Sequence, residues 1–308
     1  MSFLAWSRNL KFFDPVIPSA VEGSRCESFK VTFAGSLDYA LWYGLFRGEG
    51  APNSATSPLR AAAWHLTQFT AADDRLAIAC ARRALERNPR SVAACQYEAV
   101  GYTTDLLCGW SGDVTADTTA AVEAGRRAVA LSPADAASQG IFGLALALAR
   151  DPGGALASGR RALSLGGTST NALGFVIGIL SLVGEAAESN DLIARKLDLA
   201  PAHHCRALDV AHMALNWLRL GAPERGLPYA DEAVRLKPEA IRGHLTRAAV
   251  LGAIGRTEDA RAALVKALAL RPDLDWTLVN AMYPYSASAD AERLHDALRA
   301  AGLRDSKT

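Results

Sequence analysis

The sequence predicts an all-α protein built from consecutive helix–turn–helix pairs, and three observations support this fold class. First, two neighbouring stretches repeat with a fixed period: Pro238 and Pro272 stand 34 residues apart, as do Gly221 and Gly255. Second, apolar residues inside each stretch recur at three- and four-residue steps, which places them on one helix face. Third, 50% of the residues are hydrophobic, enough for a continuous core. Such a period is typical of stacked helical hairpins.

One repeat unit can be read residue by residue in the second copy. Ala260, Leu264 and Ala267 share one helix face and suit a close helix–helix contact. Gly255 supplies the turn between the two helices, because glycine adopts a positive φ at little cost. Pro272 ends the second helix.

This unit resembles the tetratricopeptide repeat. The eight positions at which that repeat has residue preferences hold His244, Arg247, Ala248, Leu251, Ala260, Leu264, Ala267 and Pro272. His244 and Arg247 depart from the preferred aromatic residue and leucine. The resemblance implies a right-handed superhelix of about six such pairs, followed by a C-terminal capping pair of helices.

The first part of the chain does not fit the repeat. Prolines and glycines interrupt residues 1–36, which we expect to be poorly ordered. Residues 37–58 are expected to form a lone helix, Leu37–Phe46, and a linker. The superhelical domain is expected over residues 59–303, and residues 304–308 form a flexible tail.

The first two helix pairs differ in length. The first pair is expected at Leu59–Gln68 and Asp73–Arg87. The second is expected at about Ser91–Leu107 and Ala116–Leu131. It exceeds the period, and the extra residues are expected to lengthen its first helix and the loop GWSGDV, residues 109–114, that follows.

The next three pairs are placed by the period. The third and fourth start near Ala136 and Thr170, the fourth ends at Pro201, and the fifth ends at Pro238. Pro228 falls inside the second helix of the fifth pair. A proline in a helix interior costs about 3 kcal/mol, so we expect that helix to start late or to bend.

The chain ends with a different pattern. Two helices are expected at Leu274–Met282 and Asp290–Ala301, with a turn at residues 283–286 between them. Terminal units of repeat proteins need a polar outer face. The residues that supply it in the last helix are Glu292, Arg293, Asp296 and Arg299.

Two segments carry a more specific resemblance. GWSGDVTADTTAAVEAGRRAVALSPADA, from residue 109, and NAMYPYSASADAERLHDALRAAGL, from residue 280, resemble one bacterial family. It is the tetratricopeptide region found behind class III adenylate cyclase and winged-helix domains, and the resemblance covers about Leu59–Leu303. Residues 1–57 leave no room for either output domain. The resemblance therefore implies an alternative function, a regulatory or sensor fragment without its output domain.

The N-terminal segment carries another resemblance. The run DPVIPSAVEGSR, within residues 1–36, resembles translated bacterial interspersed DNA repeats. The corresponding expectation is an over-extended or truncated reading frame, in which case an N-terminal output domain is missing.

The charge balance and the cysteine content limit which partners and which cellular compartment the sequence favours. The chain has 33 basic and 32 acidic residues, a balance that gives no case for nucleic acid or an anionic membrane as the main partner. The longest apolar runs are shorter than the roughly 20 residues of a membrane-spanning helix. Five cysteines, none in a CxxC pair, indicate reduced thiols and a cytoplasmic location.

The sequence offers little catalytic chemistry, and we expect no enzyme activity, no cofactor and no metal. It contains neither a phosphate-binding loop ending in GK[ST] nor a GxSxG motif. His203, His204 and Cys205 form its densest group of metal-ligand types, and His212 is two helical turns from His204. Adjacent helical residues point in different directions, so a solvated helix start is favoured over a metal site.

The predicted binding surface is the concave face, which the first helix of each pair lines in tetratricopeptide arrays. That face is small and apolar here, with two arginines toward one end. The predicted groove residues are Leu144, Leu148, Gly174, Gly178, Leu182, Leu215, Leu218, Arg219, Arg242 and Leu245. An apolar groove suits an amphipathic helix or a hydrophobic segment, so the sequence predicts a protein–protein interaction scaffold. Two alternatives are that these residues bury one another in a tight superhelix, or that residues 37–46 fill the groove.

Overall fold

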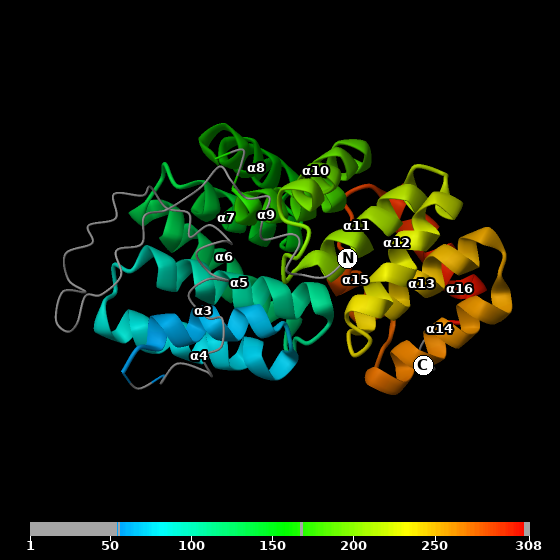
Figure 1. Cartoon of the computed structure of the whole chain (residues 1–308), viewed down its shortest axis with the longest axis horizontal. Coiled ribbons are helices and arrows are strands. Elements are labelled where there is room, and N and C mark those ends of the chain that lie inside the picture. The colour runs from blue at the N-terminus through cyan, green and yellow to red at the C-terminus, as the bar shows by residue number, and fades with distance from the viewer. Residues whose placement is uncertain (1–53, 55, 167–168, 305–308) are drawn as a thin grey trace, which may run out of the picture. The chain divides into compact units, whose positions relative to one another are not determined.

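The computed structural model describes residues 54, 56–166 and 169–304 (Figure 1). This described part contains fourteen helices and no strand, which confirms the all-α fold class. The helix predicted at Leu37–Phe46, and with it the proposal that residues 37–46 fill the groove, lies outside the described residues. None of the described helices combines the length and the apolar character that a membrane crossing requires.

Twelve of the helices form six consecutive pairs, and a C-terminal pair follows. The pairs are α3 (Pro58–Gln68) with α4 (Ala71–Arg87), α5 (Val92–Cys108) with α6 (Val114–Leu131), α7 (Ala136–Leu148) with α8 (Pro152–Gly166), α9 (Thr170–Val183) with α10 (Ala186–Leu199), α11 (Arg206–Arg219) with α12 (Pro223–Leu236), α13 (Ile241–Ile254) with α14 (Thr257–Leu270), and α15 (Trp276–Met282) with α16 (Ser288–Ala300).

The six pairs stack as a helical-repeat superhelix with two layers. The first helices of successive pairs, from α3 to α13, pack against one another and form the inner layer. Each second helix packs against its own partner, and those from α4 to α12 also pack against the first helix of the next pair. Small residues permit this spacing: a Cβ on Gly226 would lie 2.6 Å from the main-chain oxygen of Ala214. Ala121 and Ala260 stand at the equivalent positions of α6 and α14 and are fully buried.

Local signals set most helix ends. Gly255 ends α13 with a φ of +84°, as the sequence predicts. Asp151 accepts the main-chain N–H of Gly154 at 3.0 Å and caps the start of α8. The predicted late start of the fifth pair's second helix is wrong, because α12 begins at Pro223 and continues through Pro228. Pro228 lacks only one N–H donor, and the helix contacts on both sides hold the remaining turns.

The C-terminal pair packs onto the inner layer. Helix α16 contacts α11 and α13, and α15 contacts α5. The N–H of Ser286, between these two helices, donates to the main-chain oxygen of Leu182 at 3.0 Å. A Cβ on Gly252 would clash with the main-chain oxygen of Ala297. The inner face of the last pairs is therefore covered by the chain itself.

Candidate binding pocket

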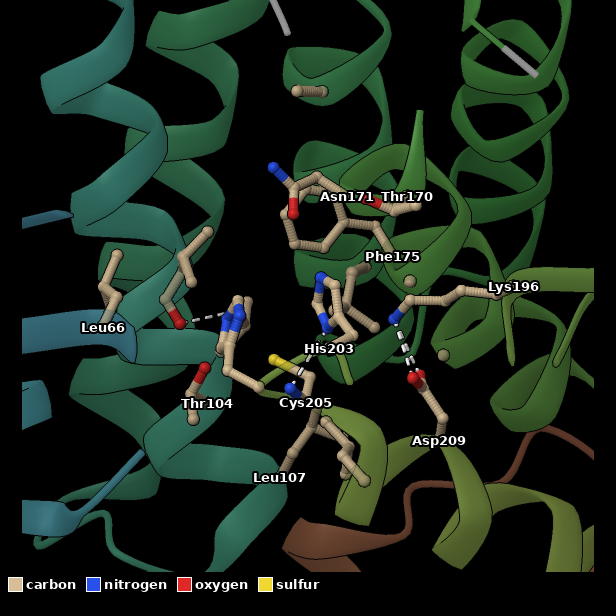
Figure 2. A pocket seen from close by; sticks show the side chains of 18 of the residues that line it. Leu66, Thr104, Leu107, Thr170, Asn171, Phe175, Lys196, His203, Cys205 and Asp209 are labelled. Carbon is tan, nitrogen blue, oxygen red and sulfur yellow. Dashed lines mark hydrogen bonds and ion pairs between the residues drawn. The ribbon is translucent and has the colours of Figure 1, made fainter. Parts of the chain in front are cut away.

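A pocket of about 110 Å³ lies on the inner face of the array (Figure 2). Its walls come from α5, α7, α9 and α11, and from the loop that joins α10 to α11. Most of the lining is apolar, and Val100, Leu107, Leu144, Phe175 and Leu208 contribute to it. The tight curvature of the inner layer brings side chains from more than 100 residues apart around one hollow.

Glycine residues on α9, which have no side chain, create part of this space. Thr170, Gly174 and Gly178 stand four residues apart and so share the face of α9 that lines the pocket. A Cβ on Gly174 would lie 2.8 Å from Lys196 Nζ, and one on Gly178 would lie 2.9 Å from Leu144 Cδ1. Larger residues at either glycine would displace a pocket wall.

A buried ion pair forms one side of the pocket. Lys196 reaches inward from the outer helix α10, and its Nζ lies 3.0 Å and 2.8 Å from the two carboxylate oxygens of Asp209 (Figure 2). Both side chains are almost fully buried. Burial raises the pKa of Asp209, and the Lys196 ammonium opposes that rise. The pair brings charge into the pocket wall without adding net charge.

The loop before α11 places His203, His204 and Cys205 in another part of the pocket wall. The solvated helix start favoured from the sequence is wrong, because His203 is 5% exposed and its ring stacks on that of His204 at 4.4 Å between centroids. Burial and the nearby Lys196 hold the pKa of His203 well below its usual value and lower the pKa of His204 to about 3. Burial raises the pKa of Cys205 to about 12. At neutral pH this wall holds two uncharged imidazoles and a protonated thiol.

The ligand atoms of these three residues lie within 4.8 Å of one another, so the cluster must be tested as a metal site. The main-chain N–H of Cys205 donates to Nδ1 of His203 at 3.1 Å, which places the proton of the neutral ring on Nε2. A metal ion would have to displace that N–H or that proton. Lys196 adds a nearby positive charge. The arrangement is therefore not preformed for a cation.

The leucines and glycines predicted for the groove separate into two groups. Leu144, Gly174 and Gly178 line the pocket. The others are buried in one apolar cluster and contribute to the core of the array. These residues are Leu148, Leu182, Leu215, Leu218 and Leu245.

The two predicted groove arginines contact the chain's own C-terminal segment. Arg219 pairs with Asp290 at 2.6 Å and lies over the ring of Tyr285, 4.6 Å from its centroid. Arg242 lies over the ring of Tyr283, 4.4 Å from its centroid. Both guanidinium groups are buried. They are engaged inside the protein in this conformation.

Sequence reasoning missed the polar groups of the pocket, Lys196 above all. A signal was present: Lys196 stands 34 residues after Ala162, so a long cationic side chain replaces a fully buried alanine of the repeat. A charged residue at a position that packs between helices must reach an acceptor or water. Its acceptor, Asp209, lies in the next pair, where the repeat pattern gives no indication of it.

Comparisons with known proteins bear on the fold. No family model and no curated protein matches the chain. The structure of IFIT1, a monomeric mutant with Gppp-AAAA, is similar with a TM-score of 0.58 and 16% identity, over 80% of this chain and 59% of that chain. A tetratricopeptide repeat protein from Parabacteroides merdae ATCC 43184 has a TM-score of 0.49 and 14% identity, over 84% of this chain and 90% of that chain. YrrB, described as a TPR protein with an unusual peptide-binding site, has a TM-score of 0.39 and 18% identity, over 58% and 93%. At these identities the similarity concerns the fold alone.

Proposed function

We propose that this chain is a non-catalytic binding module that holds a segment of a partner protein by one apolar side chain. The observation that carries the proposal is the pocket between α5, α7, α9 and α11, with its volume of about 110 Å³ and mostly apolar walls. An apolar cavity of roughly 150 Å³ accommodates benzene. The pocket is somewhat smaller, so one side chain no larger than a leucine or a phenyl ring is the size of group that fits.

The surroundings of the pocket favour a short anchored segment over a long amphipathic helix. The inner face of α11 and α13 is covered by α16, so a long helix would have to displace it. Thr104 and Asn171 are partly exposed residues of the pocket lining and carry polar groups beside the apolar walls. Peptide recognition commonly combines a buried anchor side chain with hydrogen bonds to the main chain.

The state of the titratable groups favours binding over covalent chemistry. A thiol acts as a nucleophile in its thiolate form, and the raised pKa of Cys205 keeps it protonated. The Lys196 amine is held by Asp209. The proposal includes a cytoplasmic location. It is supported by the thiols of Cys80, Cys95 and Cys108, which form no disulfide. The alternative function, a fragment of a cyclase or transcription regulator, rests on sequence resemblance alone.

The test uses the full chain and an array of defined acetylated octapeptides. Thr104→Phe places a phenyl ring at the pocket, and Thr119→Phe, on the exposed surface of α6, is the matched control. We expect bound peptides to share one essential apolar residue and to bind Thr104→Phe at least about tenfold more weakly, while Thr119→Phe binds normally. Circular dichroism confirms that both variants are folded. Equal binding by Thr104→Phe, or no peptide bound by the unaltered chain, would contradict the proposal.

A further inference from the structure

One end of the pocket is polar and contains a hydroxyl group that makes no hydrogen bond with the described residues. Thr170 is 6% exposed and lines the pocket, yet its Oγ1 has no hydrogen-bond partner among the described residues. Buried hydroxyl groups are normally hydrogen-bonded. Thr170 lies one helical turn before Gly174, on the same face of α9, and Figure 2 shows it beside Asn171 and Phe175.

The Lys196 ammonium reaches the pocket at the same end. One of its three N–H groups donates to Oδ1 of Asp209 at 3.0 Å, and Oδ2 of Asp209 lies 2.8 Å from Nζ as the second oxygen of the ion pair. Gly174 has no side chain to cover the Nζ atom, since a Cβ there would lie 2.8 Å from it. The Lys196 N–H groups that do not donate to Asp209 Oδ1 and the Thr170 hydroxyl therefore both belong to the pocket lining, the hydroxyl at the N-terminal turn of a fourteen-residue helix.

We propose that this polar end receives an uncharged oxygen acceptor of the bound group, such as an amide carbonyl, next to the apolar part that fills the pocket. The inference rests on the proposed function and specifies its ligand. Asp209 already neutralises Lys196, and both are buried. A carboxylate would bring a negative charge without a counter-ion into a mostly apolar pocket, whereas a carbonyl oxygen needs only the two donors.

The same chemistry has two sources, a residue of a polypeptide or a free small amide. In both cases the recognised unit is a leucine- or phenyl-sized apolar group that carries a carbonyl. The test below separates the two sources by the length of the probe.

The experiment titrates the full chain with four probes, followed by ligand-observed NMR. N-acetyl-leucinamide and N-acetyl-phenylalaninamide carry the uncharged carbonyl, N-acetylleucine carries a carboxylate, and toluene carries no oxygen. Thr170→Val removes the hydroxyl group and keeps the shape, and because that hydroxyl is unpartnered the variant should fold normally. Thr119→Val, on the surface of α6, is the control.

We expect the amides to bind more tightly than N-acetylleucine, and Thr170→Val to weaken amide binding by about 3- to 10-fold, the effect of one hydrogen bond. Toluene binding should be the same in the unaltered chain, Thr170→Val and Thr119→Val. Tighter binding of the carboxylate, or amide binding that Thr170→Val leaves unchanged, would overturn the inference. Equal weakening of amide and toluene would also overturn it, because the hydroxyl would then act through shape.

Two further results separate this inference from the proposed function. If neither toluene nor an amide binds the unaltered chain, the pocket is not an anchor and both fail. A capped tripeptide, acetyl-Ala-Leu-Ala-amide, that binds at least as tightly as N-acetyl-leucinamide supports a polypeptide ligand. Exclusion of the tripeptide while the single amide binds would keep the polar-end inference and overturn the partner-protein function.

Discussion

Arg242, on α13, donates a hydrogen bond of 2.7 Å from Nη1 to the main-chain oxygen of Leu107, in the last turn of α5. These residues are 135 positions apart in the chain. The last carbonyl groups of a helix have no partner inside it, and a guanidinium group can satisfy them. Arg271 does the same for Gly109, at 2.8 Å. The second pair and the sixth pair are thereby tied together across the inner face.

Replacement of Arg242 by Met should destabilise the fold by about 2–4 kcal/mol. The carbonyl groups of Leu107 and Met282 lose their donor, and a buried acceptor left without a partner costs about 1–3 kcal/mol. The Nε and Nη2 groups of Arg242 have no hydrogen-bond partner among the described residues, so relief of their burial offsets part of this loss. Urea unfolding measures the difference.

The matched control for this prediction is Arg256→Met. Arg256 pairs with Asp259 on the protein surface, and such a pair contributes about 0–1 kcal/mol. If Arg242→Met were as stable as Arg256→Met, the tie between α13 and α5 would contribute nothing to stability.

The buried pair of Lys196 and Asp209 should show strong coupling. Lys196→Met leaves the Asp209 carboxylate buried without a counter-charge, which should cost about 3–5 kcal/mol. Lys196→Met combined with Asp209→Asn removes both charges and should recover a large part of that loss. A double-mutant cycle from urea unfolding gives the coupling. Additive effects of the two single substitutions would show that the pair is not energetically linked.

The helix pairs could be predicted because their signals are local and repeat. The 34-residue period, a turn glycine such as Gly255 and a capping residue such as Asp151 each act within a few positions of the helix end they set. The late start predicted from Pro228 is wrong because a local signal gives only the cost of a proline inside a helix. The packing of α12 against α11 and α13 outweighs that cost, and this packing involves other helices.

The pocket could be predicted only in part. Leu144, Gly174 and Gly178 were assigned to the inner face from their place in the repeat, and they line the pocket. The burial of Arg242 could not be foreseen, because it depends on contacts with α5 and with the C-terminal segment. The polar end depends on Lys196 reaching Asp209 in the next pair, and a repeat pattern carries no information on such a contact.

Gly252→Ala should destabilise the contact between α13 and α16. The added Cβ would clash with the main-chain oxygen of Ala297, and backbone atoms cannot move aside as a flexible side chain can. Overpacking of this kind costs about 1–3 kcal/mol. Gly112→Ala is the control, because nothing lies within 4 Å of a Cβ at that position. In thermal unfolding, Gly252→Ala should have a lower midpoint temperature than Gly112→Ala. Equal midpoints would mean that α16 does not pack closely on α13.

The histidine His212 should make the protein less stable in mild acid. Burial, with Arg242 and Arg219 nearby, holds its pKa well below the ordinary value of 6.5. The unfolded chain therefore takes up a proton near pH 6.5 while the folded state does not, so this contribution is complete above pH 6.5 and is lost as the pH falls. His212→Gln should reduce the dependence of unfolding free energy on pH between 6.5 and 5, and the lowered pKa values of His203 and His204 should preserve the rest of that dependence. An unchanged slope would show that His212 is protonated in the folded state.

Asp74 should have the opposite effect from His212: it should make the folded protein less stable as the pH rises. Its side chain is fully buried on α4, and neither carboxyl oxygen has a hydrogen-bond partner among the described residues. Burial, and then the nearby Asp105 and Asp73, raise its pKa from 3.8 to about 9. The folded state thus keeps a proton that the unfolded chain releases. This contribution to stability is complete below pH 3.8 and is lost as the pH rises to about 9, by at most about 1.4 kcal/mol per pH unit.

The substitution that isolates this effect is Asp74→Asn, which has the same shape and carries no proton to lose. Urea unfolding between pH 5 and 9 should show a decline in the unaltered chain, a smaller decline in Asp74→Asn, and a variant more stable than the unaltered chain at pH 8. Glu86→Gln, an exposed position on the same helix, should follow the unaltered chain. Parallel curves for Asp74→Asn and the unaltered chain would mean that the carboxyl group of Asp74 reaches water, since only a solvated carboxylate ionises without opposing the fold.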